Sequence, residues 1–300
     1  MTLKYEILKR LVKLIGIRRM WDLDAEEIVE RKKKQNMRNR IPALEDPDLY
    51  IGTVMIDGFP VIRMIHKDPV QKACMFVIGG GMVSAPRPAS VRKALKVAKQ
   101  SGLDLYVPYY PLCTDYPITR PYRMIEKTYE EMLKKYKAED ITLLGTSSGG
   151  NLALGLIAHL NATGSDLPKP GHVMAISPGT CPVSEAEENR MKELDRKDVA
   201  IPMSYMYLAE TIMTHGEEVP DYMLHLQNGD YRGLPYVTFI YGSDEVLYAF
   251  APSLEDAMKR SDVPYEMIVG EGMFHCYPIF PIVKEAKEGR DLMIKKLKEG

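Results

Sequence analysis

The spacing of hydrophobic residues changes along the chain, from the period of helices to that of strands. At positions 3–15 apolar residues recur at steps of three and four, which predicts an amphipathic helix. A second helical pattern occupies 24–38, and Pro42 breaks the chain after it. From Tyr50 onward the apolar residues recur with the period of strands instead. We therefore expect residues 1–45 to form a helical unit distinct from the rest of the chain.

Residues 51–66 predict an antiparallel hairpin, because Asp57-Gly58 favours the tight turn that matches strand twist. Beyond Pro69, short apolar runs alternate with helical patterns. This alternation is typical of an α/β protein with a mainly parallel sheet, helices on both faces and the hairpin as an antiparallel edge. The predicted strands are 73–78, 103–107, 141–144, 173–176, 236–241 and 265–269. The predicted helices are 89–100, 122–136, 148–160, 249–260 and 281–298.

The alternation stops between residues 180 and 230, where no strand pattern is found. Helical patterns occupy 184–197 and 203–215, and the second is rich in Met and Tyr. An insertion here would lie over the carboxyl ends of the strands, where open α/β sheets bind ligands. It is either a lid over a site or a set of extra core helices. The predicted division is a helical N-terminal unit at 1–45, an α/β core at 46–179 and 231–300, and an inserted helical unit at 180–230.

The composition excludes few classes of protein. The 300 residues are 45% hydrophobic with a net charge of -1, which gives no general reason to expect nucleic acid as a partner. The basic run at 31–34 is interpreted as a solvated helix face, with a binding patch as the alternative. Charged residues interrupt the N-terminal apolar pattern, so neither a signal peptide nor a membrane span is expected. Four scattered cysteines fit reduced thiols in the cytoplasm, and no metal or cofactor is implied.

Ser147 lies in a motif that suits a nucleophile. An apolar run leads into Gly145-Thr146-Ser147-Ser148-Gly149, and a helical pattern leaves it. Glycines two positions to either side of Ser147 would let a strand turn sharply into a helix and expose the serine above the sheet. So short a motif also arises by chance. The hypothesis therefore needs a base, an acid and an oxyanion hole elsewhere in the chain.

Candidates for the base and the acid come after later strands. Of the six histidines, only His275 lies in a loop after the last predicted strand. Asp244 directly follows the strand at 236–241, although it could equally cap the next helix. Ser147, Asp244 and His275 thus follow three different parallel strands. Their order along the chain is that of the catalytic triad in the α/β-hydrolase fold.

Three consecutive glycines, Gly79 to Gly81, follow the strand at 73–78 and are the candidate oxyanion loop. The amides of Gly80 and Gly81, with that of Ser148, would bind the charge of a tetrahedral intermediate. The competing interpretation is a dinucleotide-binding glycine loop. It is disfavoured because Ser84 stands where the last glycine should be, and prolines prevent a helix from opening there.

Over nearly the whole chain these motifs resemble those of the hormone-sensitive-lipase-like esterases, in the branch whose nucleophile motif is Gly-Thr-Ser-Ala-Gly. Residues 145–153 are similar to that motif, with Ser148 in place of the usual alanine. The resemblance implies that the N-terminal helices and the insertion form a cap over an acyl pocket. Further similar motifs lie at 110–117, 177–178, 242–247 and 272–275.

Ile78 departs from the family pattern, because the family's oxyanion loop begins with a histidine that buttresses it. The backbone donors remain, so the prediction is a serine carboxylic-ester hydrolase of small apolar acyl esters, with Ser147, His275 and Asp244 as its triad. Activity should fall on the acid side, because His275 must be neutral to act as a base. A non-catalytic small-molecule-binding protein, or an amidase or peptidase, stays open as an alternative. The oligomeric state is also open, a dimer included.

Overall fold

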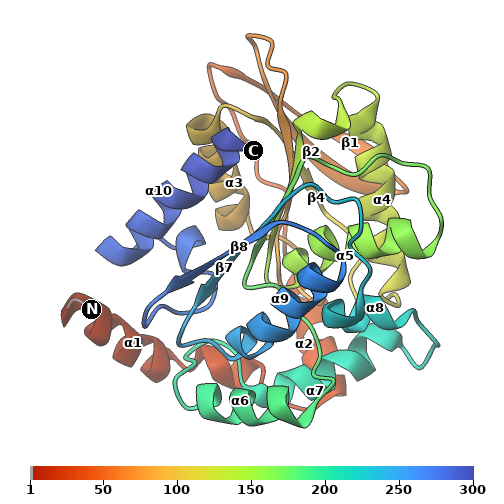
Figure 1. Cartoon of the computed structure of the whole chain (residues 1–300). Helices are drawn as coiled ribbons and strands as arrows, with labels where there is room; N and C mark the ends of the chain where they lie inside the picture. The colour runs from red at the N-terminus through yellow and green to blue at the C-terminus, as the bar shows by residue number, and fades with distance from the viewer. Residues whose placement is uncertain (1–2) are drawn as a thin grey trace.

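An eight-stranded sheet runs through the molecule in the order β1-β2-β4-β3-β5-β6-β7-β8 (Figure 1). The structure, a computed structural model, describes residues 3–300. Residues 1 and 2 of the predicted N-terminal unit lie outside the described residues. So do the side chains of Leu3, Lys4, Glu6, Leu8, Leu11, Ile15 and Ile17.

The predicted antiparallel edge is confirmed. β1 (Leu49–Ile56) pairs with β2 (Phe59–His66) around a turn in which both Asp57 and Gly58 have positive φ, the geometry that a two-residue hairpin requires. β2 is also antiparallel to β4, and all other neighbours are parallel. The strands of the parallel part are β3 (Ala73–Val77), β4 (Asp104–Pro108), β5 (Ile141–Thr146), β6 (His172–Ile176), β7 (Val237–Gly242) and β8 (Tyr265–Gly270).

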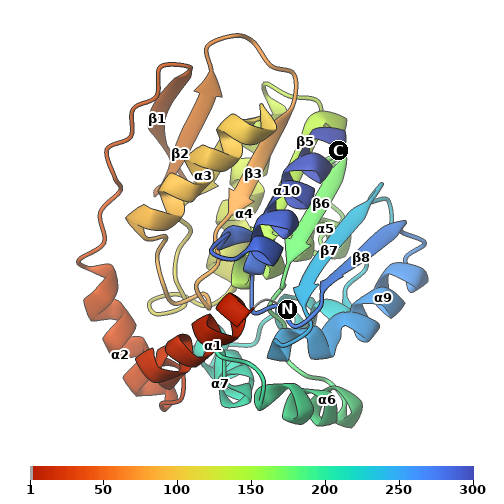
Figure 2. The same cartoon turned by 90° about the vertical axis from the view of Figure 1, so that its left-hand side faces the viewer.

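Helices cover both faces of the sheet, as the alternating sequence pattern predicts. One face carries α3 (Pro88–Ser101) and α10 (Lys284–Glu299), which lie side by side in Figure 2. Along β3, Cys74 and Phe76 belong to the core on that face, and Met75 and Val77 to the core on the other. Because the side chains on both faces of β3 are buried, its sequence is a continuous apolar run. The opposite face carries α4 (Thr119–Leu133), α5 (Ser148–Ala162) and α9 (Ala251–Arg260).

The N-terminal segment and the insertion lie together beyond one end of the sheet (Figures 1 and 2). α2 contacts α7, and α7 contacts α6. No strand interrupts residues 180–230, as predicted. Within residues 3–300, no helix has both the length and the apolar character needed to cross a membrane. The helices here are α1 (Leu3–Ile15), α2 (Ala25–Asn36), α6 (Glu185–Asp195), α7 (Met203–Thr214) and α8 (Asp221–Leu224), with the short 3₁₀ turn η1 (Ile17–Met20) after α1.

The structure differs from the sequence prediction mainly at short helical pieces. α10 begins three residues later than the predicted 281, after Pro281 and Val283, which lie outside any helix. α8 is absent from the prediction, because four residues are too few to display a helical period. The remaining 3₁₀ turns are η2 (Ala138–Asp140), η3 (Leu226–Asn228), η4 (Val246–Phe250) and η5 (Tyr277–Ile279).

Candidate active site

Ser147 stands at the sharp turn between β5 and α5. Its φ of 53° and ψ of -127° are strained for a residue with a side chain. A Cβ on Gly149 would lie 2.0 Å from the Val77 carbonyl oxygen, and one on Gly145 would lie 2.2 Å from that of Gly149. The two glycines of the motif are therefore required by close backbone approach. They hold Ser147 half-buried at the end of the strand, where it lines a cavity.

His275 lies in the loop after β8, and its Nδ1 is 2.5 Å from Oε2 of Glu245. The Glu245 side chain is fully buried. Its Oε1 accepts hydrogen bonds from the Ser177 hydroxyl and the Gly242 amide, each at 2.7 Å. The carboxylate that orients the imidazole is thus itself fixed by two donors, which is the geometry of a triad acid.

Asp244, the acid predicted from the sequence, does not contact His275. Its Oδ2 forms an ion pair with Lys9 Nζ of α1 at 2.6 Å. The backbone at Glu245 is extended, with φ of -115° and ψ of 145°, so successive side chains leave it on opposite sides. Asp244 therefore faces α1 while Glu245 faces His275. Asp244 and Glu245 are neighbours in the sequence, and no sequence pattern indicates which of the two side chains points toward His275.

The environment of His275 alters its pKa in two directions. Burial alone would lower the pKa of the imidazole, but interactions with Cys276 and Glu245 outweigh it and raise the pKa well above its ordinary value. Nε2 lies 3.5 Å from Cys276 Sγ. Among the described residues, no hydrogen bond joins His275 to Ser147, although both side chains line the same cavity. Catalytic hydrogen bonds are often this loose before substrate binds.

The glycine loop approaches Ser147, but two of its amides are already engaged. The Gly79 amide donates to Thr146 Oγ1, and the Gly80 amide donates to Ser148 Oγ, both at 3.0 Å. The prediction that the Gly80 N–H is free to bind an oxyanion is therefore not met, because Ser148 already accepts its hydrogen bond. Within residues 3–300, the amides of Gly81 and Ser148 make no hydrogen bond. These two remain as free donors beside the nucleophile.

A cavity of about 230 Å³ opens in front of Ser147. The sheet side contributes the glycine loop and His275, while Trp21 and residues of α7 close it from the other side. Trp21 packs edge-on against Tyr205 with ring centroids 4.6 Å apart, and the Tyr205 hydroxyl donates to the Gly81 carbonyl at 2.7 Å. The insertion is thus bonded directly to the candidate oxyanion loop, and the N-terminal segment packs on the insertion at this point.

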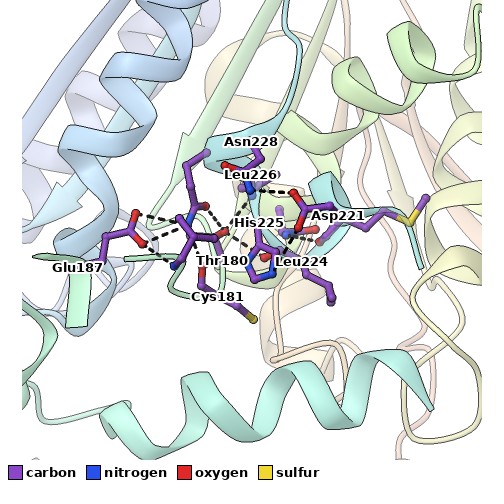
Figure 3. A network of polar contacts seen from close by, with 12 residues as sticks. Thr180, Cys181, Glu187, Asp221, Leu224, His225, Leu226 and Asn228 are labelled. Carbon is purple, nitrogen blue, oxygen red and sulfur yellow. Dashed lines mark hydrogen bonds and ion pairs between the residues drawn. The ribbon is translucent and has the colours of Figure 1, made fainter. Parts of the chain in front are cut away.

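A buried polar network fixes another part of the cavity wall (Figure 3). Thr180 Oγ1 accepts the Leu226 amide at 2.9 Å and contacts Gln227 Oε1 at 2.7 Å. Gln227 in turn donates to the Cys181 carbonyl at 2.8 Å and to the Glu187 carboxylate. Thr180 and Cys181 both line the cavity. The network therefore holds this wall against α6 and the 3₁₀ turn η3.

Asp198, in the loop between α6 and α7, is a buried carboxylate that the sequence prediction missed. Its Oδ1 accepts the Ala200 and Ile201 amides at 2.7 and 3.0 Å, and its Oδ2 accepts the Val246 amide at 2.8 Å. Burial raises the pKa of Asp198, while the charge of His275 and these hydrogen bonds lower it less strongly. Asp198 thus ties the insertion to the residue after Glu245. No spacing pattern marks it in the sequence.

Comparison with known families supports the same fold. The model of an α/β-hydrolase-fold family matches residues 74–279. The chain belongs to this family. An acetyl-hydrolase of Streptomyces hygroscopicus is 31% identical over 157 residues, which are 49% of this chain and 50% of that protein. This chain therefore matches about half the length of that relative.

Solved structures with the same fold cover nearly the whole chain. An esterase/lipase from an uncultured bacterium superposes with a TM-score of 0.80 at 18% identity over 100% of both chains. EstE5, in a crystal soaked with p-nitrophenyl butyrate, gives a TM-score of 0.81 at 18% identity over 100% of this chain and 99% of that chain. An esterase of the bacterial hormone-sensitive lipase family gives a TM-score of 0.77 at 19% identity over 96% of this chain and 97% of that chain. The predicted α/β-hydrolase fold and the resemblance to this family are confirmed.

Proposed function

We propose that this protein is a serine carboxylic-ester hydrolase. The observation that carries the proposal is the convergence of the strained Ser147 and the buried His275–Glu245 pair on one apolar cavity. Its fold family, the partial match to an acetyl-hydrolase and the esterases among its structural neighbours support the same activity.

In the proposed reaction, Ser147 Oγ attacks the ester carbonyl carbon and His275 Nε2 takes its proton. Glu245 stabilises the imidazolium that forms. His275 then gives the proton to the departing alcohol, which leaves an acyl-enzyme, and a water molecule hydrolyses that ester by the same steps. The free amides of Gly81 and Ser148 bind the oxyanion, while Gly80 shapes the loop.

The proposed substrates are small esters with apolar acyl groups. A cavity of about 230 Å³ is smaller than sites for drug-sized ligands, which are typically roughly 300 to 1,000 Å³. Its wall is built largely from Met, Ile, Leu and aromatic side chains. We assign residues 1–45 and 180–230 to a cap that closes the acyl site, since Trp21 and Tyr205 line it from these two segments.

Hydrolysis of p-nitrophenyl acetate and butyrate by wild type and Ser147→Ala tests the proposal. We expect turnover by the wild type, labelling of Ser147 by a fluorophosphonate, and only the background rate in the variant. Ser165→Ala, in a loop after α5, is the matched control and should retain wild-type activity.

Absence of turnover together with an unlabelled Ser147 would contradict the esterase proposal and favour a non-catalytic binding protein. Faster cleavage of a p-nitroanilide than of the ester with the same acyl group would instead favour an amidase or peptidase.

A further inference from the structure

Two buried hydroxyl groups hold the glycine loop at the point where Ile78 replaces the family's histidine. Ser148 Oγ accepts the Gly80 amide at 3.0 Å, and Tyr110 Oη donates to the Ile78 carbonyl at 3.0 Å. Ser148 is 4% exposed and Tyr110 is 3% exposed. The loop is thus held at Gly80 and just before its start, at Ile78, by side chains from outside it.

Each of the two hydroxyls pairs with a different backbone group of the loop. Ser148 accepts from the Gly80 N–H, and Tyr110 donates to the Ile78 carbonyl. Burial, the larger effect, raises the pKa of Tyr110, and the nearby Ser148 lowers it. A buried polar group left unpaired is costly, so losing either hydroxyl would weaken the hold on the loop.

The Ile78 side chain cannot supply polar support to the loop. It is 6% exposed and packs with the core cluster that includes Phe76 and Val107. Polar support comes instead from other side chains around the loop, and on the elbow side it comes from Thr146 and from Ser148, which directly follows the nucleophile. The same residue contributes a free backbone amide beside Ser147, so both the amide and the hydroxyl of Ser148 act at the candidate oxyanion site.

We propose that Ser148 is a positioning residue, whose hydroxyl holds Gly79–Gly81 in the geometry that binds the oxyanion. The inference rests on the proposed esterase function. Replacing Ser148 by alanine would leave the Gly80 amide without its partner, and the loop would lose its register with Ser147. Since the loop acts on charge that develops in the transition state, the loss falls on kcat and not on KM.

Steady-state kinetics with p-nitrophenyl butyrate test the inference in wild type, Ser148→Ala, Tyr110→Phe and the double variant. Ser148→Ala should lower kcat about tenfold with KM within about twofold, which is less than the roughly 100-fold loss of a direct donor. Tyr110→Phe should lower kcat in the same way. The double variant should lose no more than about twofold beyond Ser148→Ala, because both hydroxyls hold the same loop.

Tyr129→Phe is the matched control, since Tyr129 is equally buried and donates to the Pro168 carbonyl at 2.7 Å in a loop that does not line the cavity. Its kcat should equal that of wild type. A kcat of Ser148→Ala at or above the wild-type value would overturn the inference, and so would losses that multiply in the double variant or an effect on KM alone. If Ser148→Ala does not fold, the kinetics of Tyr110→Phe test the inference alone. This variant removes only one oxygen atom, so it is expected to fold. Failure of the wild type to cleave the ester would instead refute the proposed function.

Discussion

The protonation of His275 depends on its immediate neighbours, Cys276 and the buried carboxylate of Glu245. Glu245 is shielded from solvent and held by Ser177 and Gly242, so its charge acts on the imidazole with little screening. Interactions with Cys276 and Glu245 overcome the effect of burial and raise the pKa of His275. Because a general base works only when neutral, a raised pKa moves the acidic limb of activity to higher pH.

We therefore predict that His275 titrates above the ordinary histidine value of about 6.5. An NMR titration of the imidazole, assigned with His275→Asn, measures this directly. Glu245→Gln should lower the pKa, because the negative charge that favours the imidazolium is removed. A His275 pKa at or below the ordinary value in wild type, or an unchanged pKa in Glu245→Gln, would contradict this account of the site.

At the scale of elements, the loop between α6 and α7 is fixed to the acid loop by Asp198. We predict that Asp198→Asn lowers the free energy of unfolding by about 2 kcal/mol, because an amide cannot accept from three backbone N–H groups as a carboxylate does. It should also lower kcat about tenfold, since Val246 directly follows Glu245 and a small displacement of a catalytic group is costly. Thermal unfolding and ester kinetics measure the two effects.

Asp104 supplies the matched control for this prediction. It is 1% exposed and accepts from the His66 amide and Tyr136 at the opposite, amino end of β4. Asp104→Asn should lose similar stability with an unchanged kcat. Equal effects of both variants on kcat would show that Asp198 acts only through general stability.

Long elements can be predicted from the sequence because their pattern repeats over many residues. The strands β3, β5 and β7, and helices such as α3 and α5, lie where the apolar periods place them. The identity of the acid cannot be predicted, because Asp244 and Glu245 are neighbours and only the extended backbone decides which one faces His275. Likewise, the engagement of the Gly80 amide depends on a rotamer of Ser148 that no sequence pattern specifies.

At the scale of the whole molecule, the candidate cap and the core share the cavity. Trp21 comes from the N-terminal segment, packs on Tyr205 of α7 and lies under Lys32 Nζ, which is 3.9 Å from its ring centroid. Residues far apart in the sequence therefore set the size of the cavity together. Changes in the cap should consequently alter which acyl chains fit, without altering the chemistry at Ser147.

We predict that Trp21→Ala shifts the preference toward longer acyl chains. Removing the indole enlarges the apolar space, so the ratio of kcat/KM for p-nitrophenyl octanoate to that for the butyrate should rise about tenfold. Tyr207→Ala, at an exposed aromatic residue of the same helix as Tyr205, should leave the ratio unchanged. An unchanged ratio in Trp21→Ala would mean that the acyl group does not reach the cap.

The central claim is that Ser147 is activated by His275 held by Glu245, and one paired measurement tests it most directly. It compares kcat for p-nitrophenyl butyrate in Glu245→Gln and Asp244→Asn. Glu245→Gln should lower kcat by about 10⁴, the order found when a triad acid is replaced by its amide. Asp244→Asn loses only the contact with Lys9 and should retain kcat within about threefold, since partly exposed ion pairs contribute little. The reverse result, a large loss in Asp244→Asn with an active Glu245→Gln, would contradict the account.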